Sequence, residues 1–292
     1  MNDCTVCLSF DFDAISGWLF RGETSPTSIS RGEFGARVGI YRVLDLLTQH
    51  QIPATFFIPG HTCDTFPAET KLVAAAGYEI GHHGYCHEVP NTLTRDAEEA
   101  ILERGIAAIQ RICGKAPTGY RSPSWDLSPH SLDLLLAHGF RYDSSLMADD
   151  FTPYLCRSGD AGDADGPYRF GQPVPLVELP VSWMLDDFPA FEWNARRGSG
   201  LAAPSHVEEI WREEFDFMYE RVPGGVFNLT MHPQVIGRAH RIRMLDRLVR
   251  HMRGRPGVRF AMLGEVAERV RPGLLATLPA GTATTTAASE RG

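Results

Sequence analysis

The sequence lacks the features that would send the chain into or across a membrane. No stretch of its 292 residues is apolar over the length that crosses a bilayer. The N-terminus leads directly into a short run of β-formers, without the basic segment and long apolar segment of a secretory signal peptide. We therefore expect a cytoplasmic protein with no membrane partner.

Clustered positive charge is also absent. The formal net charge is −8, and the sequence contains no run of basic residues. Proteins that bind nucleic acid usually present a basic patch to the phosphate backbone. Nucleic acid is therefore not an expected partner.

The six cysteines do not form a disulfide pattern. They are scattered through a long chain, which is typical of reduced thiols. Cys4 and Cys7 have the C-x-x-C spacing, but residues three apart in a strand point to opposite faces. A redox or zinc role for this pair is not expected.

Short runs of β-formers alternate with amphipathic helical segments along most of the chain. The expected strands are residues 4–12, 53–58, 78–81, 118–121, 140–143, 176–181, 226–231 and 258–260. The expected helices are residues 38–50, 69–76, 95–113, 129–138, 207–221, 241–252 and 263–270. Alternation of this kind predicts a parallel sheet, and most simply an α/β barrel of about seven parallel strands.

The remaining segments set the limits of the predicted domain. Residues 16–32 are rich in Gly, Ser, Thr and Pro and are expected to form a long loop, a candidate lid. Residues 149–175 are expected to be an irregular insertion. We expect one barrel domain over residues 1–271 and a disordered tail over residues 272–292.

Three imidazoles and a carboxylate are crowded into residues 82–88. His83 and His87 are four apart, so on a helical turn both rings would leave the same face and could hold Zn, Fe, Ni or Co. His82 would lie about 140° around such a helix from His87 and is a poorer partner. Gly84 also permits a non-helical loop, and the pair could simply be two ordinary histidines near a strand end.

Two carboxylates follow the first strand. Asp11 and Asp13 project to the same side at its C-terminal end, where they repel each other unless a cation or a shared proton intervenes. An Asp pair that begins a turn is the simpler explanation. Beside an imidazole cluster, however, the pair would supply a third metal ligand and a general base.

Polar residues after several strands are expected to converge, because barrel enzymes carry their chemistry at the C-terminal ends of the strands. Six residues occupy such positions, namely Asp11, Asp13, His83, His87, Arg121 and His232.

On these motifs the chain resembles the polysaccharide deacetylase family, the NodB-homology or carbohydrate esterase family 4 group. The motifs occur in the family's order at residues 9–13, 83–87, 121–125 and 229–233, and the likeness runs from about Cys7 to Glu265. The details are more similar to a subgroup with allantoinase-like and cyclic imide hydrolases. The resemblance implies a distorted barrel of the NodB type.

The resemblance also implies a metal site and a base. Asp13, His83 and His87 match the family's metal ligands, and the ion is expected to be Zn²⁺, with Co²⁺, Ni²⁺ or Fe²⁺ as alternatives. Asp11 matches the general base and Arg121 the residue that orients it. The usual first motif has adjacent Asp residues, whereas Phe12 separates them here, so the division of roles between Asp11 and Asp13 stays open.

The resemblance also implies a general acid and residues that line a substrate pocket. His232 matches the general acid that protonates the leaving nitrogen. A backbone N–H near Tyr85 is expected to stabilise the oxyanion, and Trp125 to form a pocket wall, whereas Trp183 is expected in the core. Asp186 and Asp187 could orient His232 or be plain loop acids.

These residues predict a metal-dependent hydrolase of non-peptide C–N bonds in a small molecule such as a cyclic imide or ureide. An alternative is an N-deacetylase or N-deformylase of an amino sugar, a peptidoglycan fragment or a specialised metabolite. A catalytically inactive barrel that only binds carbohydrate is disfavoured, because Asp13, His83, His87 and His232 are all present. Related small-substrate members suggest a homo-oligomer, a tetramer or a dimer.

Overall fold

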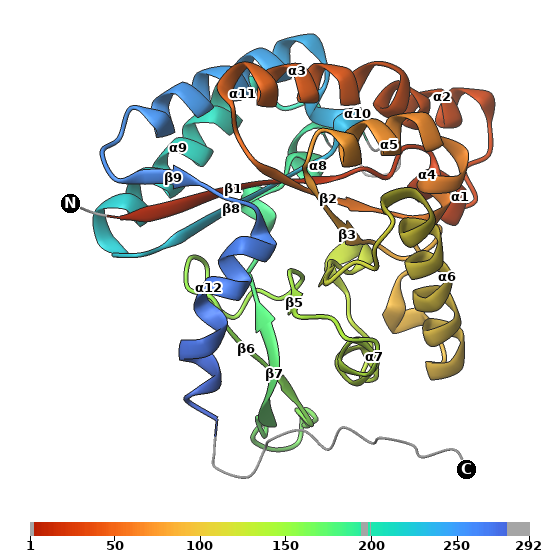
Figure 1. The fold of residues 1–292 in the computed structure, drawn as a ribbon, viewed down its shortest axis with the longest axis vertical. Coiled ribbons are helices and arrows are strands. Elements are labelled where there is room, and N and C mark those ends of the chain that lie inside the picture. The colour runs from red at the N-terminus through yellow and green to blue at the C-terminus, as the bar shows by residue number, and fades with distance from the viewer. Residues whose placement is uncertain (1–2, 194–197, 199, 279–292) are drawn as a thin grey trace.

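Strand β1 (Cys4–Asp11) pairs in parallel with three neighbours in the computed structural model, which describes residues 3–193, 198 and 200–278. Its partners are β2 (Ala54–Ile58), β8 (Val226–Met231) and β9 (Val258–Phe260). All eight residues of β1 are buried, as expected of a strand covered on both faces. The first strand is therefore an interior strand of the sheet (Figure 1).

The nine-stranded sheet follows the order β6-β7-β5-β4-β3-β2-β1-β8, with β9 added beside β1. The remaining strands are β3 (Glu79–His82), β4 (Gly119–Tyr120), β5 (Tyr142–Asp143), β6 (Tyr154–Ser158) and β7 (Gln172–Glu178). Among the described residues, every pairing is parallel except that of β6 with β7. The curled sheet confirms the predicted α/β fold, a distorted barrel of the NodB type.

Helices cover the outer face of the sheet (Figure 1). The longer ones are α2 (Pro26–Phe34), α3 (Ile40–His50), α5 (Pro67–Ala75), α6 (Arg95–Cys113), α9 (Pro204–Arg221), α11 (Ala239–Arg253) and α12 (Leu263–Leu275). The shorter ones are α1 (Ser16–Phe20), α4 (Gly60–Thr65), α7 (Ser131–Ala137), α8 (Asp187–Phe191) and α10 (Pro233–Ile236). None of the described helices is long and apolar enough to cross a bilayer.

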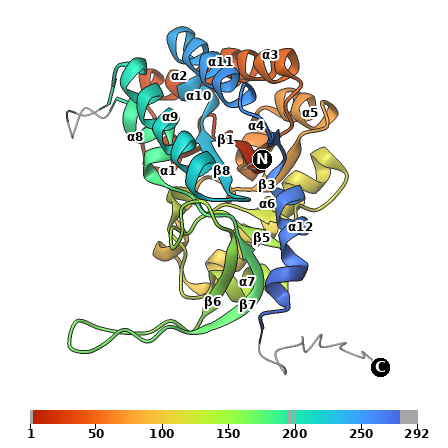
Figure 2. The same cartoon turned by 90° about the vertical axis from the view of Figure 1, so that its left-hand side faces the viewer.

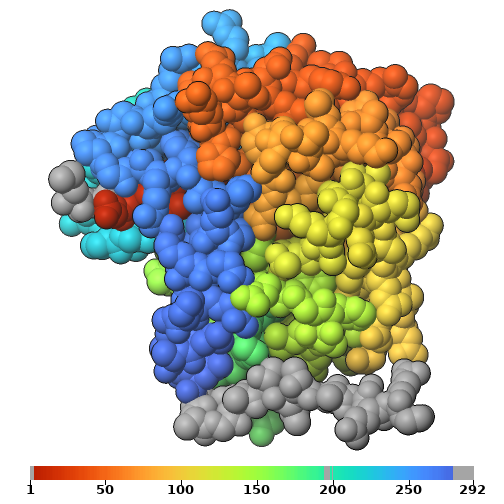
Figure 3. All heavy atoms as spheres, viewed as in Figure 1, coloured from red at the N-terminus to blue at the C-terminus, as the bar shows by residue number. Residues whose placement is uncertain are grey.

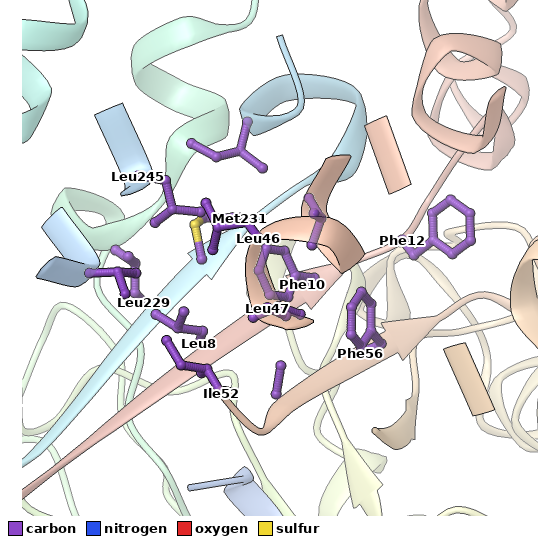
Figure 4. Packing of buried hydrophobic residues seen from close by; sticks show 14 of the residues in the cluster. Leu8, Phe10, Phe12, Leu46, Leu47, Ile52, Phe56, Leu229, Met231 and Leu245 are labelled. Carbon is purple, nitrogen blue, oxygen red and sulfur yellow. The ribbon is translucent and has the colours of Figure 1, made fainter. Parts of the chain in front are cut away.

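Alternation along β1 separates the core from the site. Leu8 and Phe10 belong to the large apolar cluster under the helices, where they lie near Leu46 and Leu47 of α3 (Figure 4). Ser9, between them, instead hydrogen-bonds to Asn228 at 3.2 Å inside the barrel. The same alternation turns Asp11 and Asp13 towards the barrel interior.

The sheet is not closed by a full strand ladder. Beyond β7, the described chain pairs with β8 in one isolated parallel β-bridge, between Asp186 and Thr230. The amide of Asn228 adds a hydrogen bond to the carbonyl of Pro180 at 3.0 Å. These contacts join the two ends of the sheet near its C-terminal edge.

The prediction of a long loop over residues 16–32 is wrong, because this segment forms helices α1 and α2. The local signal is a helix start: the Ser25 hydroxyl accepts a hydrogen bond from Ser28 N–H, and Pro26 occupies the first turn. A π-helical turn (Gly35–Gly39) then joins α2 to α3.

Residues 149–175 are not irregular either. They contain β6 and the start of β7, which pair antiparallel and project as a long hairpin (Figure 2).

The last helix is longer than the expected range of residues 263–270. Helix α12 continues through Pro272 to Leu275, and its last apolar residues, Leu274 and Leu275, pack against the core cluster that contains Val177 and Leu263. In Figure 3 this helix lies along the visible face as the lower blue segment. The rest of the expected tail, residues 279–292, lies outside the described residues.

Candidate metal and catalytic site

Asp13, His83 and His87 come together just beyond the C-terminal ends of β1 and β3. Asp13 Oδ1 lies 3.5 Å from His83 Nε2, and Asp13 Oδ2 lies 3.9 Å from His87 Nε2. All three side chains are buried, and their ligand atoms lie within 4.8 Å of one another. A carboxylate oxygen with two imidazole nitrogens can hold a divalent metal ion.

A tight turn, not a helix, delivers the two histidines. Gly84 has φ 71° and His87 has φ 65°, so the chain after β3 folds through left-handed conformations. Of the two alternatives, the non-helical loop that Gly84 permits is the one observed, and the rings of His83 and His87 lie 5.1 Å apart between centroids. His82 faces the other way, with its Nε2 3.1 Å from the carbonyl of Leu102 in α6.

The protonation of the cluster suits a metal. His83 Nδ1 lies 2.8 Å from the carbonyl of Arg121, which can only accept, so Nδ1 is the donor and Nε2 is the nitrogen that faces Asp13. Burial lowers the pKa of His87 to about 4, against the opposing charge of Asp13, so this ring is neutral at pH 7. Asp13 Oδ1 and His87 Nδ1 are buried without a hydrogen-bond partner among the described residues. The three residues fit a divalent ion.

Arg121 holds Asp11 in place beside the cluster. Its Nη1 donates to Asp11 Oδ1 and to Ser9 Oγ, each at 2.9 Å. Its other nitrogens donate to the carbonyl and hydroxyl of Ser144, and its guanidinium lies 4.3 Å from the ring centroid of Phe57. Burial would raise the pKa of Asp11, but the charges of Arg121 and the nearby histidines lower it below its usual value. Asp11 is therefore a fixed carboxylate.

His232 lies across the cluster from Arg121 and carries a proton. Its Nε2 is 3.9 Å from Asp11 Oδ2 and 3.8 Å from Asp13 Oδ2. Its Nδ1 lies 2.7 Å from Asp187 Oδ1, and Asp186 Oδ1 lies 3.6 Å from the same nitrogen. Burial alone would lower the pKa of His232, but the hydrogen bond and charge of Asp187 raise it well above its usual value. Of the two roles considered for Asp186 and Asp187, the structure favours orientation of His232.

Tyr85 is held by contacts of its backbone, its hydroxyl and its ring. Its backbone N–H donates to Glu88 Oε2 at 3.0 Å, so an oxyanion would have to compete with Glu88 for this donor. Its hydroxyl donates to Asp64, and the guanidinium of Arg104 lies 3.4 Å from its ring centroid. Among the described residues that line the pocket, Tyr85 is absent.

The cluster opens into a pocket of about 1060 Å³ with aromatic walls. Trp125 stacks on Trp183 at 4.3 Å between ring centroids and 30° between ring planes. Trp183 is 47% exposed, so its expected place in the core is wrong. Ser124 and Trp125 have φ 59° and 54°, a costly conformation for residues other than glycine that is typical of functional sites.

Several residues of the pocket and site were not found from the sequence. Gln234 Nε2 donates to Asp13 Oδ2 at 3.3 Å, two positions after His232. Trp18 and Arg21 line the pocket from the segment mistaken for a loop. The Ser25-Pro26 helix start was the signal that could have shown this segment to be ordered.

Comparisons with known proteins agree with this geometry. The polysaccharide deacetylase family model matches residues 35–142. The peptidoglycan deacetylase of Helicobacter pylori is 40% identical over 281 residues, which cover 91% of this chain and 96% of that protein. A Mycobacterium smegmatis structure described as a polysaccharide deacetylase is 35% identical, with a TM-score of 0.82 over 93% of this chain and 91% of the other.

The fold is also shared with an allantoinase. Its structure is 18% identical and superposes with a TM-score of 0.76 over 92% of this chain and 90% of that chain. The family model and the two relatives of 40% and 35% identity show that the chain belongs to the polysaccharide deacetylase family and is a hydrolase of carbon–nitrogen bonds other than peptide bonds.

Proposed function

We propose that the chain is a metal-dependent hydrolase that opens an amide bond in a small molecule, such as a cyclic imide or ureide. The observation that carries this proposal is the pairing of two proton-transfer groups in opposite states around one metal-ligand cluster. Asp11 is held as a carboxylate and His232 as an imidazolium, each with its side chain facing Asp13 or His83. A carboxyl group with a lowered pKa and an imidazole with a raised pKa are suited to act as base and acid, respectively.

The ligands in this proposal are Asp13, His83 and His87, and the ion is Zn²⁺. Two imidazoles and a carboxylate, with room left for water, are a ligand set of catalytic zinc sites. Such an ion would polarise the substrate carbonyl and lower the pKa of a water molecule.

The protein's own groups would then move the protons. Asp11 is the base in this scheme, because Arg121 fixes its rotamer and keeps it ionised. It would take the proton of the attacking water. His232 would give its Nε2 proton to the leaving nitrogen, since an amide nitrogen leaves poorly until it is protonated. Asp187 holds His232 in the tautomer and orientation that this donation requires.

The walls of the pocket support a small substrate in this proposal. Helices α1 and α2 cover one side with Trp18 and Arg31, and residues after β7 cover the other with Trp183 and Phe188. Flat aromatic faces suit a planar imide or ureide ring.

An N-acetyl group on an amino sugar or peptidoglycan fragment is the second candidate. The specific observation in its favour is the 40% identity with the peptidoglycan deacetylase of Helicobacter pylori. The same base, acid and metal ligands would serve both reactions, so the substrate must be found by assay.

The test combines metal analysis with hydrolysis on the same samples. Wild-type protein is compared with His83→Ala and with His206→Ala, a control on the exposed surface of α9. Zinc, cobalt, nickel and iron are measured by elemental analysis, and hydrolysis is assayed with succinimide, maleimide and N-acetylglucosamine oligomers. We expect one ion per chain and imide hydrolysis in the wild type and the control, and neither in His83→Ala.

The other outcomes are equally informative. Metal with hydrolysis of the acetylated oligomers but not of the imides would replace the first candidate by the second. No metal in the reconstituted wild type would contradict the mechanism.

A further inference from the structure

The guanidinium groups of two arginines in the pocket pack against the ring of one tryptophan. The guanidinium carbons of Arg21 and Arg31 lie 5.4 Å and 5.6 Å from the ring centroid of Trp18, which is only 2% exposed. A buried ring is a fixed platform for both cations. The two arginines therefore have defined positions at the wall of the pocket.

Their hydrogen bonds distinguish the two. Arg31 is engaged: its Nη2 donates to the carboxylate of Glu192 and, at 2.7 Å, to the carbonyl of Trp193. Arg21 donates no hydrogen bond to any described residue, and its nearest acid is Glu23, 3.8 Å from its Nε. The guanidinium of Arg21, whose only ion pair with a described residue is this long one with Glu23, can thus donate hydrogen bonds to a ligand.

Arg21 lies close to the metal ligands. A Cβ placed on Gly17 would lie 3.5 Å from Arg21 Nη1 and 3.9 Å from Cδ2 of His87. The guanidinium and the His87 ring therefore flank the same small gap, which stays open because residue 17 has no side chain. A group bound to Arg21 would lie beside a carbonyl bound at the cluster.

We propose that Arg21, supported by Trp18, forms an anion subsite for a carboxylate of the substrate, so that the hydrolysed amide belongs to a small carboxylated molecule. The inference rests on the proposed function and names the class of its substrate. A planar carboxylate matches the guanidinium fork in two parallel hydrogen bonds. A dianionic phosphate fits less well, because Glu23 and Glu192 also line the pocket and would repel the second charge.

The test is a comparison of two four-carbon ligands, succinate and butyrate, by isothermal titration calorimetry of the metal-loaded protein. Both can place one carboxylate at the metal, but only succinate has a second one for Arg21. The wild type should bind succinate about tenfold more tightly than butyrate, the gain expected of one charge-assisted contact.

Three variants assign that gain. Arg21→Gln should reduce the ratio of the two affinities to about one without changing the affinity for butyrate. Gly17→Ala should also reduce the ratio, because its methyl group fits at ordinary contact distances but fills the gap beside His87. Arg37→Gln is the control for lost charge, since this arginine is 68% exposed and pairs with Glu33 outside the pocket.

Equal affinities in the wild type, binding of neither ligand, or a ratio unchanged by Arg21→Gln would overturn the subsite. Failure of the proposed function is a different result: no hydrolysis of any amide tested, with the preference for succinate still present and still dependent on Arg21. Hydrolysis without that preference would overturn the subsite alone.

Discussion

Asp187 accepts two hydrogen bonds from His232, one from the ring and one from the backbone. The ring nitrogen Nδ1 lies 2.7 Å from Asp187 Oδ1, and the backbone N–H of His232 lies 3.1 Å from each carboxylate oxygen. The two bonds fix both the main chain and the ring of the residue. The rotamer and the charge of His232 therefore depend on one buried carboxylate.

Asp187→Asn should lower kcat by about 10²- to 10⁴-fold, the loss typical of a disabled acid–base group. The physical reason is a lower pKa for His232, because Asp187 is the main group that raises it against burial. A group whose pKa falls loses its proton at lower pH, so the alkaline limb of the kcat profile should move to lower pH. The measurement is kcat as a function of pH.

Asp186→Asn is the matched comparison. Asp186 lies farther from Nδ1, at 3.6 Å, and its Oδ1 also accepts the N–H of Phe188 at 2.9 Å. Asp186→Asn should therefore move the alkaline limb of the kcat profile less than Asp187→Asn does. An alkaline limb that stays in place in Asp187→Asn would contradict the assigned role of His232.

Arg121→Gln should reduce the free energy of unfolding by about 3–5 kcal/mol, because it leaves the buried carboxylate of Asp11 without its cation. Urea denaturation measures this loss. The control is Arg141→Gln, which breaks an exposed ion pair with Glu268 and should cost less than about 1 kcal/mol. Similar losses in the two variants would show that Asp11 is not held as a buried ion.

Glu178 and Asp143 form a carboxyl pair inside the barrel, on neighbouring strands and fully buried. Glu178 Oε1 accepts the N–H groups of Ser145 and Leu146, each at 3.0 Å. Burial raises the pKa of Asp143 to about 6 and that of Glu178 well above its usual value. The folded pair therefore keeps a proton that the unfolded chain would release.

This pair should make stability depend on pH. Its contribution is complete below the unfolded pKa values and is lost as the pH rises through about 6 for Asp143 and higher for Glu178. Glu178→Gln, whose amide can replace the protonated carboxyl, should flatten the fall of Tm with rising pH. Glu268→Gln, at the surface, should leave the slope unchanged. A slope that survives in Glu178→Gln would rule out this source.

Trp183→Ala should raise KM about three- to tenfold with little change in kcat, because an exposed aromatic face contributes to binding and not to proton transfer. The side chain is 47% exposed, so its loss should not unfold the protein. Steady-state kinetics with the substrate found in the assay measures both constants. Phe170→Ala, which removes an exposed ring of the hairpin, is the control. An unchanged KM in Trp183→Ala would place the substrate elsewhere.

Local pattern was enough to predict much of the fold. Helix α6 begins and ends where the sequence predicts, because Thr94 caps its first turn and Gly114 takes the left-handed conformation at its end. Strands β8 and β9 also have the predicted bounds. In each case the signal lies within the element itself.

Long-range contacts explain most of what was missed in the site. Trp183 follows β7, yet it lies in the pocket because it stacks on Trp125 from another loop. Asp187 meets His232 from 45 residues away. The backbone N–H of Tyr85 shows a different limit, since Glu88, three residues later, accepts the hydrogen bond that an oxyanion there would need. Composition and spacing do not reveal such competition for one donor.

The incomplete closure of the sheet separates the proposed acid from the proposed metal ligands. Asp13, His83 and His87 all lie on the β1–β3 side, whereas the pair of His232 and Asp187 forms across the junction marked by the Asp186–Thr230 bridge. If heat first separates the sheet at this junction, the proposed proton donor loses its orientation while the three proposed ligands stay together. Inactivation on heating should then precede metal release, and an inactive protein could still be fully metallated.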